Sequence, residues 1–284
     1  MFQNVVIAGP GLIGGSLGLA MKANGLAGRI VGVGHRTSSL DLARDMGAID
    51  EGSLDLASVV GEADLVVLAT GVQLICEQAA TAVGRMKDGA ILTDVGSVKQ
   101  AICGNVRDAL AVRSDGTVRF VGAHPLAGSE QRGVQAARAD LYRNALCVIT
   151  PTKETDAEAK ARIRLLWESV GCRVVEYSPE VHDRLLAEVS HLPHVVAACL
   201  LNAASDDALE LAAAGFMDTT RVASGDADLW REICMLNRDA LASSLREFSE
   251  VLARFAQAIE DDDEDAVRDE LDRAKTRRDA RLRR

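Results

Sequence analysis

A glycine-rich turn between a strand-like and a helix-like segment is the feature that most restricts how this chain can fold. Residues 9–14, with the sequence GPGLIG, fit the pattern G-x-G-x-x-G and directly follow the apolar segment Asn4–Ala8. In this context Gly9 permits a tight turn, Gly11 lets a pyrophosphate approach the backbone, and Gly14 lets the helix pack closely on the strand. Free N–H groups at the N-terminus of the following helix favour phosphate. The residues expected at this dinucleotide site are Gly9, Gly11, Leu12, Ile13 and Gly14.

Strand-like and helix-like segments alternate through the first half of the chain. This alternation predicts an α/β fold with a parallel, doubly wound sheet of the Rossmann type. The expected strands are Asn4–Ala8, Arg29–Gly34, Leu65–Ala69, Ala90–Asp94, Val118–Ala123, Ala145–Ile149 and Arg173–Tyr177. The expected helices between them are Leu12–Asn24, Leu40–Met46, Leu74–Met86, Lys99–Leu110 and Thr155–Val170.

The composition changes near Ser178, and no convincing strand follows this residue. The helical patterns beyond it are Glu180–Ala204, Asp207–Ala214, Leu229–Ile259 and Glu264–Arg281. We therefore expect two domains, a dinucleotide-binding domain over residues 1–178 and an all-helical domain over residues 179–284. Apolar, alanine-rich helices such as His194–Ala204 are typical of helices that pack against a partner subunit.

The overall composition excludes several classes of protein. The chain has 284 residues, 48% of them hydrophobic, and its formal net charge of −10 argues against nucleic acid as a partner. No uncharged apolar run approaches the length of a transmembrane helix, and the N-terminus lacks the pattern of a signal peptide. The six cysteines are scattered without a CxxC pair. We therefore expect reduced thiols, no metal site and a cytoplasmic protein.

The end of the second expected strand bears on the choice of cofactor. Enzymes that use NAD usually carry an acidic residue there for the ribose hydroxyls. This chain has His35, Arg36, Thr37 and Ser38 instead, with no acid among them. A guanidinium and two hydroxyls suit a 2′-phosphate, so we favour NADP as the cofactor. The alternative is that Arg36 only stacks on the adenine and that the protein uses NAD.

Two polar side chains are expected at the carboxyl edge of the sheet, where open α/β sheets bind their ligands. His124 follows the apolar run Val118–Ala123, and we expect Pro125 to end the pairing of that strand. An imidazole exchanges protons near neutral pH, which makes His124 a candidate general base. Ser97 follows the strand Ala90–Asp94 and is a second candidate, although it could instead cap the helix that begins beside it.

Two further clusters of polar residues lie in the helical half. The segment SHLPH places His191 and His194 about one helical turn apart. The segment FMDTTR brings together Asp218, two threonines and Arg221. Structural explanations stay open for both clusters, because His191 could be a hydrogen-bonded core histidine and Arg221 could simply pair with Asp218.

These motifs occur together in a known family, in the same order and with approximately the same spacing. The glycine-rich turn, DVGSVK at 94–99, HPLAGSE at 124–130, SHLPH at 190–194 and GFMDTTR at 215–221 resemble the prephenate/arogenate (cyclohexadienyl) dehydrogenases of tyrosine biosynthesis. The resemblance covers essentially the whole chain. It implies a Rossmann-type domain, a helical domain that forms a homodimer, a nicotinamide cofactor, and the oxidative decarboxylation of a cyclohexadienol.

The resemblance also implies roles for individual residues. His124 would hold and deprotonate the ring hydroxyl, Ser97 would share that hydroxyl, and Arg221 would bind a substrate carboxylate. The further candidates on the substrate side are Glu130, His191, His194, Asp218 and the more loosely matched Trp230. Because Glu130 and His194 resemble the prephenate-accepting members, we favour prephenate dehydrogenase. An arogenate dehydrogenase, or an enzyme that accepts both substrates, is the alternative.

Two other kinds of protein share this domain plan. β-Hydroxy-acid dehydrogenases and imine reductases usually place a catalytic lysine on the helical domain. Here Glu180–Ala204 contains no lysine and the last lysine is Lys275, which counts against them. A nucleotide-sensing binding protein would keep the glycine-rich turn without needing Ser97, His124 and Arg221 together.

Overall fold

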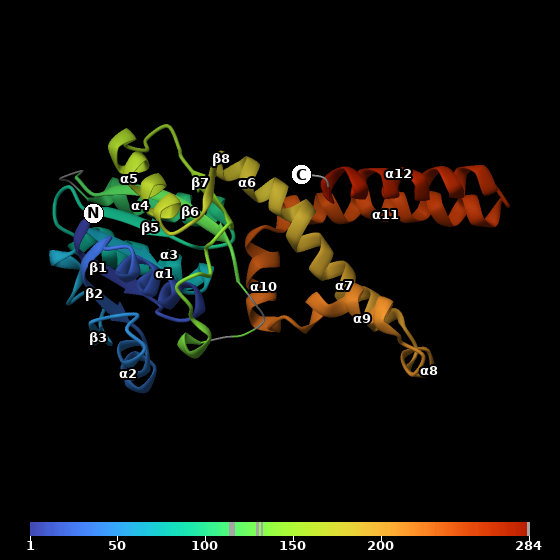
Figure 1. Cartoon of the computed structure of the whole chain (residues 1–284). Coiled ribbons are helices and arrows are strands. Elements are labelled where there is room, and N and C mark those ends of the chain that lie inside the picture. Colours follow the sequence, from blue (N-terminus) through green and yellow to red (C-terminus); the bar gives the residue numbers. More distant parts are fainter. Residues whose placement is uncertain (114–116, 129–130, 132, 283–284) are drawn as a thin grey trace.

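The computed structural model describes residues 1–113, 117–128, 131 and 133–282. Its sheet domain is built on eight strands in the order β3-β2-β1-β4-β5-β6-β7-β8 (Figure 1). The strands are β1 (Phe2–Ala8), β2 (Ala27–Val33), β3 (Glu51–Ser53), β4 (Leu65–Leu68), β5 (Ile91–Asp94), β6 (Arg119–Leu126), β7 (Leu146–Thr150) and β8 (Arg173–Glu176). The strand order reverses at β1 and β4, which places the ligand crevice of an open α/β sheet at their carboxyl ends.

Neighbouring strands of the described sheet run parallel except β6 and β7, which are antiparallel. The expectation of a wholly parallel sheet is therefore wrong at this ladder. Pro125 also does not end the pairing of its strand, because it lies inside β6 opposite Cys147. A proline is tolerated there because pairing with β5 ends at Val121, so this part of β6 has a neighbour on one side only.

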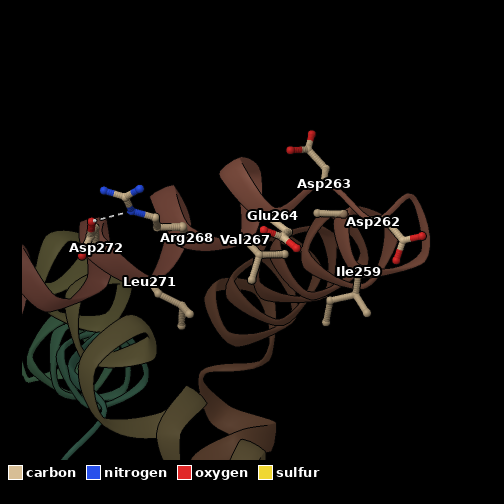
Figure 2. Close-up of a pocket in the computed structure, with 9 residues that line it drawn as sticks. Ile259, Asp262, Asp263, Glu264, Val267, Arg268, Leu271 and Asp272 are labelled. Carbon is tan, nitrogen blue, oxygen red and sulfur yellow. Dashed lines mark ion pairs between the residues drawn. The ribbon is translucent and has the colours of Figure 1, made fainter.

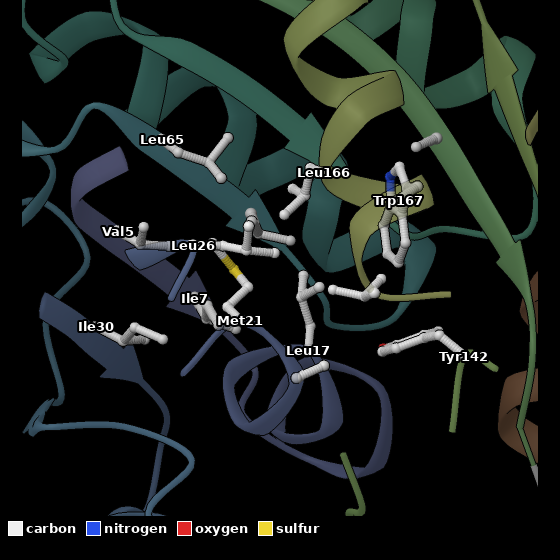
Figure 3. Close-up of a cluster of buried hydrophobic side chains, with 14 of the residues drawn as sticks. Val5, Ile7, Leu17, Met21, Leu26, Ile30, Leu65, Tyr142, Leu166 and Trp167 are labelled. Atoms are coloured by element: carbon white, nitrogen blue, oxygen red, sulfur yellow. The ribbon is translucent and has the colours of Figure 1, made fainter. Parts of the chain in front are cut away.

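Helices cover both faces of the sheet and bury a separate apolar core on each. They are α1 (Leu12–Ala23), α2 (Thr37–Asp45), α3 (Val72–Arg85), α4 (Lys99–Val112) and α5 (Ala157–Ser169), with 3₁₀ turns at Val60–Glu62 and Val134–Ala136. Successive strand residues face opposite sides, so Val5 and Ile7 belong to one core and Val6 and Ala8 to the other. Figure 3 shows the first of these cores, which lies between the sheet and helices α1 and α5.

The helical domain begins with one long, interrupted helix. The helix α6 (Pro179–Leu186) leads through a π-helical turn, Ala187–His191, into α7 (Leu192–Ala203). Pro193 lies in the first turn of α7 and has no N–H to donate to the preceding turn, which accounts for the wider turn at this point. The wider turn changes how the residues before it are rotated relative to those after it. It therefore decides the directions in which the histidines of this segment face.

The remaining helices differ from the expected ones in two places. They are α8 (Asp206–Leu209), α9 (Ala214–Thr220), a 3₁₀ turn at Arg221–Ser224, α10 (Ala227–Leu236), α11 (Arg238–Glu260) and α12 (Glu264–Leu282). The expected helix Asp207–Ala214 is wrong, because α8 and α9 are separate and shorter. The expected helix Leu229–Ile259 is broken at the buried Asn237. The helices α11 and α12 form a hairpin that extends away from the sheet (Figure 1).

One helix in the described part of the chain, Pro179–Ala203, is long and apolar enough to cross a membrane by length and composition, although the sequence predicted no such segment. Its contacts assign it to the folded protein instead. The helix α6 packs on α4 of the sheet domain, where Asp183 is fully buried. The continuation α7 buries only Ala197 and leaves its other apolar side chains partly uncovered.

Candidate active site

The glycine-rich turn has the shape that a pyrophosphate requires. Gly9 has a φ of 88°, in the region that favours glycine, and a Cβ at this position would lie 2.6 Å from the carbonyl oxygen of Ala69. Gly11 is the N-cap of α1 without a side-chain hydrogen bond, and a Cβ there would meet no atom within 4 Å. The open space over Gly11 and the free N–H groups of α1 therefore fit a bound dinucleotide.

The first turn of α1 is held in place from the protein side. The hydroxyl of Tyr142 donates to the carbonyl oxygen of Ile13 at 2.6 Å, and the Tyr142 ring packs edge-on against Trp167. A Cβ on Gly14 would lie 2.9 Å from the side chain of Ile7, so only glycine lets α1 approach β1 this closely. Leu12 is half-buried in the same turn. Contacts within the protein itself thus hold the cofactor turn in position.

The end of β2 offers charged and hydroxyl groups to solvent. His35, Arg36, Thr37 and Ser38 are all exposed, and Arg36 is the N-cap of α2. No side chain caps this helix, and within the described residues no hydrogen bond or ion pair occupies the Arg36 guanidinium. A free guanidinium beside an open helix N-terminus is an arrangement that suits a phosphate group.

On the other side of the crevice, His124 belongs to a hydrogen-bonded chain that starts in the helical domain. Nδ1 of His124 lies 2.9 Å from Nε2 of His182, and Nδ1 of His182 lies 2.7 Å from Oδ1 of Asp183. His124 comes from β6, whereas the other two residues come from α6. His182 and Asp183 are fully buried, and His124 is half-buried. The two domains therefore meet at this imidazole.

The chain of hydrogen bonds fixes where the protons lie. An ionised carboxylate only accepts hydrogen bonds, so Nδ1 of His182 carries the proton that faces Asp183. Nε2 of His182 is then an acceptor and takes the hydrogen bond from the N–H at Nδ1 of His124. Nε2 of His124 keeps its lone pair. Burial, followed by the nearby His182 and Lys99, holds the pKa of His124 well below its usual value, so this imidazole is neutral at pH 7 and its Nε2 lone pair is free to accept a proton.

A buried ion pair fixes the backbone beside both Ser97 and His124. Lys99 and Asp94 are fully buried and paired. Nζ of Lys99 also donates to the carbonyl oxygen of Ala123 at 2.8 Å, and the Ala123 N–H donates to Oδ1 of Asp94 at 3.3 Å. The other carboxylate oxygen accepts the N–H of the residue before Ser97 at 2.8 Å. The pair thus ties the residue before Ser97 to the residue before His124.

Ser97 does not cap α4, which was the alternative explanation for its position. The N-cap is Val98, and no side chain of its own segment caps the helix. The carboxylate of Asp183 accepts the N–H groups of Lys99 and Gln100 instead, at 2.7 and 2.8 Å. Ser97 is half-buried at the end of β5. Its hydroxyl is therefore not committed to the helix and is available to a ligand.

The helical domain brings two of the expected substrate residues into direct contact. The rings of His194 and Trp230 stack with their centroids 3.5 Å apart. Nδ1 of His194 donates to the carbonyl oxygen of Ser190 at 2.9 Å, which leaves Nε2 free to bind a ligand. Burial lowers the pKa of His194, and the nearby Arg221 lowers it further. The stacked rings of His194 and Trp230 form an aromatic wall, and the turn that contains Arg221 packs on α7 near it.

The remaining candidates on the substrate side are His191, Asp218 and Glu130. His191 is fully buried, Nδ2 of Asn237 lies 3.0 Å from its Nδ1, and burial lowers its pKa to about 4. It is a hydrogen-bonded core histidine whose ring lies edge-on to that of Trp230, with the ring centroids 6.1 Å apart. Asp218 is exposed on α9, and within the described ranges no ion pair joins it to Arg221. Glu130 lies outside the described residues.

Three residues at this site escaped the sequence analysis. His182 and Asp183 complete the imidazole chain, and Nδ2 of Asn237 donates to the carbonyl oxygen of Asp183 at 2.8 Å while it contacts His191. A signal for His182 was present, because the chain has only five histidines and this one directly precedes an aspartate. Nothing in the sequence marked Asn237, whose position depends on the break between α10 and α11.

Comparisons with known protein families agree with this geometry. A sequence model described as the prephenate dehydrogenase nucleotide-binding domain matches residues 17–176, and one described as the prephenate dehydrogenase dimerization domain matches residues 178–273. The chain belongs to the prephenate dehydrogenase family. Family membership makes it an oxidoreductase of tyrosine biosynthesis, and its Rossmann-type domain binds a nicotinamide dinucleotide, NAD or NADP.

Individual family members resemble the chain over nearly its whole length. Prephenate dehydrogenase of Bacillus subtilis (strain 168) is 35% identical over 270 residues, which are 93% of this chain and 72% of the relative. The crystal structure of Aquifex aeolicus prephenate dehydrogenase with hydroxyphenyl propionate and NAD+ has a TM-score of 0.90 and 32% identity, covering 98% of both chains. The Synechocystis arogenate dehydrogenase has a TM-score of 0.84 and 31% identity, covering 98% of this chain and 99% of that one.

Proposed function

We propose that this protein is a prephenate dehydrogenase, which converts prephenate to 4-hydroxyphenylpyruvate by oxidative decarboxylation with NAD or NADP. The observation that carries the proposal is the imidazole chain at the carboxyl edge of the sheet. It presents Nε2 of His124 as a neutral proton acceptor at the sheet edge where Ser97 also lies. A protein that only sensed nucleotides would not need a base held in one tautomer at this position.

The residues of the chain account for the proton transfers. His124 accepts the ring hydroxyl proton at Nε2, and Ser97 holds the same hydroxyl oxygen by a hydrogen bond. A dinucleotide held at the glycine-rich turn would supply the acceptor for the hydride of the carbinol carbon. His182 and Asp183 keep His124 in the tautomer protonated at Nδ1 and stabilise the imidazolium that forms. A base placed in this way contributes a factor of about 10²–10⁴ to the rate.

Loss of carbon dioxide completes the reaction. The bond between the ring and its carboxylate breaks, the electron pair of that bond makes the ring aromatic, and His124 returns its proton to the oxygen that becomes the phenol. Arg221 binds a substrate carboxylate through its guanidinium, and the stacked His194 and Trp230 line the same side. Glu130 is proposed as a further pocket residue from the motif alone.

Arogenate is the second candidate substrate. Prephenate and arogenate differ by a keto against an amino group on the side chain, away from the carbinol carbon where the chemistry occurs. Glu130 and His194 favour prephenate. The similarity to the Synechocystis arogenate dehydrogenase is nearly as high as that to the Aquifex aeolicus enzyme, which supports an enzyme for arogenate, or for both substrates, as the alternative.

For the cofactor, we propose that NADP is used at least as well as NAD. Arg36, Thr37 and Ser38 are exposed at the end of β2, and no acid that would repel a 2′-phosphate lies among them. We also propose the division of labour that the sequence predicted. Residues 1–178 bind the dinucleotide, and residues 179–284 form the substrate side, in a protein that works in the cytoplasm.

We propose further that the helical domain forms a homodimer. The hairpin of α11 and α12 exposes Leu252, Ile259 and Leu271 to solvent. A hollow of about 480 Å³ opens at its turn, where Figure 2 shows Ile259, Val267 and Leu271 among acidic side chains. A second copy of the chain would cover these apolar groups. Sedimentation equilibrium should give twice the chain mass, and Leu252→Arg should shift it towards the monomer. A wild-type monomer at all concentrations would remove this part of the proposal.

An assay with four combinations of ligands tests the proposed activity. Purified protein is given prephenate or arogenate with NAD+ or NADP+, and the absorbance of reduced nicotinamide and the release of carbon dioxide are followed together. We expect equal amounts of both products with prephenate. Turnover with arogenate alone would select the alternative substrate. No reduction with either substrate would refute the proposed function.

A further inference from the structure

We propose that Glu232 is a positioning residue that connects the cofactor turn to the substrate pocket, so that a bound dinucleotide raises the affinity for the substrate. The inference rests on the proposed function in one respect, because it takes the His194 and Trp230 wall as the substrate side. The residues that carry it lie on α10 and at the N-terminus of α3.

Glu232 reaches from the helical domain to the sheet domain. It is half-buried on α10, and its Oε1 accepts the backbone N–H of Gln73 in α3. Its carboxylate also lies over Gly71, where a Cβ would come within 3.2 Å of Oε2. Gly71 is the N-cap of α3 and has no side chain to cap it. A carboxylate at a helix N-terminus satisfies a free N–H and the positive end of the helix dipole. Glu232 therefore caps α3 from the other domain.

The turn before α3 supports the cofactor loop on its other side. A Cβ on Gly9 would lie 2.6 Å from the carbonyl oxygen of Ala69 and 2.8 Å from Cγ2 of Thr70. Oγ1 of Thr70 in turn donates to Oε1 of Gln78 at 2.9 Å, which anchors the turn to α3. The loop that fits a pyrophosphate thus rests directly on the turn that Glu232 caps. Because Gly9 carries no side chain, the backbone of the cofactor loop lies close against this turn, so a displacement of one has to be accommodated by the other.

The opposite end of the connection is the substrate wall. Trp230 is two residues before Glu232 on α10 and stacks on His194. Ile233, the next residue after Glu232, is buried in one core with Val72 of α3. Because Trp230, Glu232 and Ile233 lie within about one turn of the same short helix, α10 cannot shift on α3 without moving the tryptophan.

A second carboxylate follows the same plan one helix away. Asp183 of the helical domain caps α4 by accepting two of its backbone N–H groups. The helical domain thus closes the N-termini of α3 and α4 with its own carboxylates, whereas α1 has no side-chain cap. Of these three helices, α1 alone therefore keeps its N-terminus open for a pyrophosphate. The two carboxylates fix the domains to each other at the same edge where both ligands would bind.

The test measures how strongly the two ligands affect each other's binding. Isothermal titration calorimetry gives the Kd of hydroxyphenyl propionate with and without saturating dinucleotide, and the ratio of the two is the coupling factor. We expect a wild-type factor on the order of 5–150. In Glu232→Ala it should fall close to one. Glu232→Gln should keep most of it, because an amide oxygen still accepts the Gln73 N–H.

A control and an independent variant separate this role from general stability. Asp228→Ala removes an acid from the same helix, where Asp228 is exposed and pairs with Arg231 at 3.2 Å; its coupling factor should match the wild type. Gly71→Ala should lower the factor as Glu232→Ala does, because the added Cβ crowds the carboxylate. The φ of −61° at Gly71 suits alanine, so no backbone strain is introduced. The double variant Glu232→Ala with Gly71→Ala should lower the coupling factor no further than either single variant does.

The outcomes distinguish this inference from the proposed function. A wild-type factor of one, a Glu232→Ala variant that keeps the wild-type factor, or an equal loss in Asp228→Ala would overturn the role of Glu232, even if the enzyme turns over prephenate. Absence of turnover with either substrate would refute the proposed function, whatever the coupling factor is. If Glu232→Ala does not fold, Glu232→Gln and Gly71→Ala decide the matter.

Discussion

The sheet domain and the helical domain bury their apolar residues to very different degrees. The sheet domain fills two cores and encloses most of the apolar residues of its strands. Within the described part of the helical domain, the buried apolar residues are Leu186, Ala187, Ala197, Ile233 and Leu241. Large apolar side chains that stay exposed there include Val189, Leu211, Met235, Leu252 and Ile259. The sheet domain therefore folds around its own core, whereas the helical domain depends on its neighbours.

The polar groups of the candidate active site are also distributed between the two domains. The sheet domain holds the glycine-rich turn, the proposed base His124 and the buried pair of Asp94 and Lys99, all on or beside strands. The helical domain supplies His182 and Asp183, which orient the base, and the aromatic wall near Arg221. In the proposed function, the chemistry that needs fixed geometry falls to the well-packed domain, and substrate binding to the more open one. The following experiments test this contrast between the sheet domain and the helical domain.

The largest effect is expected from removing the base of the sheet domain. His124→Asn should lower kcat by about 10²–10⁴-fold, because asparagine cannot take the hydroxyl proton. The Kd for the dinucleotide should stay nearly unchanged, since the imidazole contacts His182 and not the glycine-rich turn. Steady-state kinetics and calorimetric titration measure the two quantities. Near-normal turnover would show that His124 is not the base and that the sheet domain does not supply this catalytic group.

The buried ion pair tests the rigidity of the sheet domain. Lys99→Met leaves the carboxylate of Asp94 buried without its cation, so the free energy of unfolding in urea should fall by about 3–5 kcal/mol. The matched control is Arg231→Met in the helical domain, where the pair with Asp228 is exposed and should contribute less than about 1 kcal/mol. Similar losses in the two variants would contradict the contrast between the domains.

Acid should lower the stability of the folded protein through its buried histidines. Burial lowers the pKa values of His124, His182, His191 and His194, that of His191 to about 4. In the unfolded chain each takes up a proton near about pH 6.5. As the pH falls below that value, the unfolded state binds protons that the folded state does not, so stability decreases. The loss is about 1.4 kcal/mol per pH unit for each histidine, until the folded pKa is reached.

Urea midpoints measured between pH 7 and pH 5 check this expectation, as do pH profiles of kcat/KM. The kcat/KM of the wild type should stay level as the pH falls through the ordinary titration range of histidine, because His124 remains neutral there. A drop in kcat/KM with a midpoint at the ordinary histidine pKa, or a stability that does not change, would show that these imidazoles are hydrated in the folded protein.

The local pattern of the chain was enough to predict much of the sheet domain. Strands such as Asn4–Ala8 and Leu65–Ala69 were found because short apolar runs alternate with helical periodicity, and the glycine-rich turn needs only local geometry. The antiparallel direction of β7 was missed because it depends on how a long connection returns to the sheet. Pro125 was misjudged for a related reason, since its place in β6 depends on where the neighbouring strand ends.

The site was predictable where a motif carried it and not where the domains meet. His124 and Ser97 lie at the sheet edge as expected, and His194 stacks on Trp230. His182 was missed because its role arises only when α6 packs against β6. Glu232 was missed for the same reason, since its partner Gln73 is far away in the sequence. Contacts between residues distant in the chain leave no periodic or local signal.

A smaller effect is expected from the helical wall. Arg221→Ala should raise KM by roughly 10–100-fold with less change in kcat, because a charge-assisted bond to the substrate carboxylate is made in the ground state and the transition state alike. Arg231→Ala, an exposed arginine that pairs with Asp228 on α10, is the control and should leave KM unchanged. If kcat alone fell in Arg221→Ala, the helical domain would be part of the chemistry, and the division between the two domains would not hold.

The smallest effect concerns the edge of the sheet domain that is itself exposed, at the end of β2. Arg36 is the N-cap of α2 and lies in solvent, unlike the enclosed groups around His124. Arg36→Ala should weaken NADP more than NAD, by about 1–3 kcal/mol or less because the group is hydrated, since only NADP carries the phosphate that a guanidinium grips. The Kd values of both dinucleotides for the wild type and the variant measure this difference. Equal losses would mean that Arg36 stacks on the adenine, and a wild type that ignores NADP would leave NAD as the working cofactor.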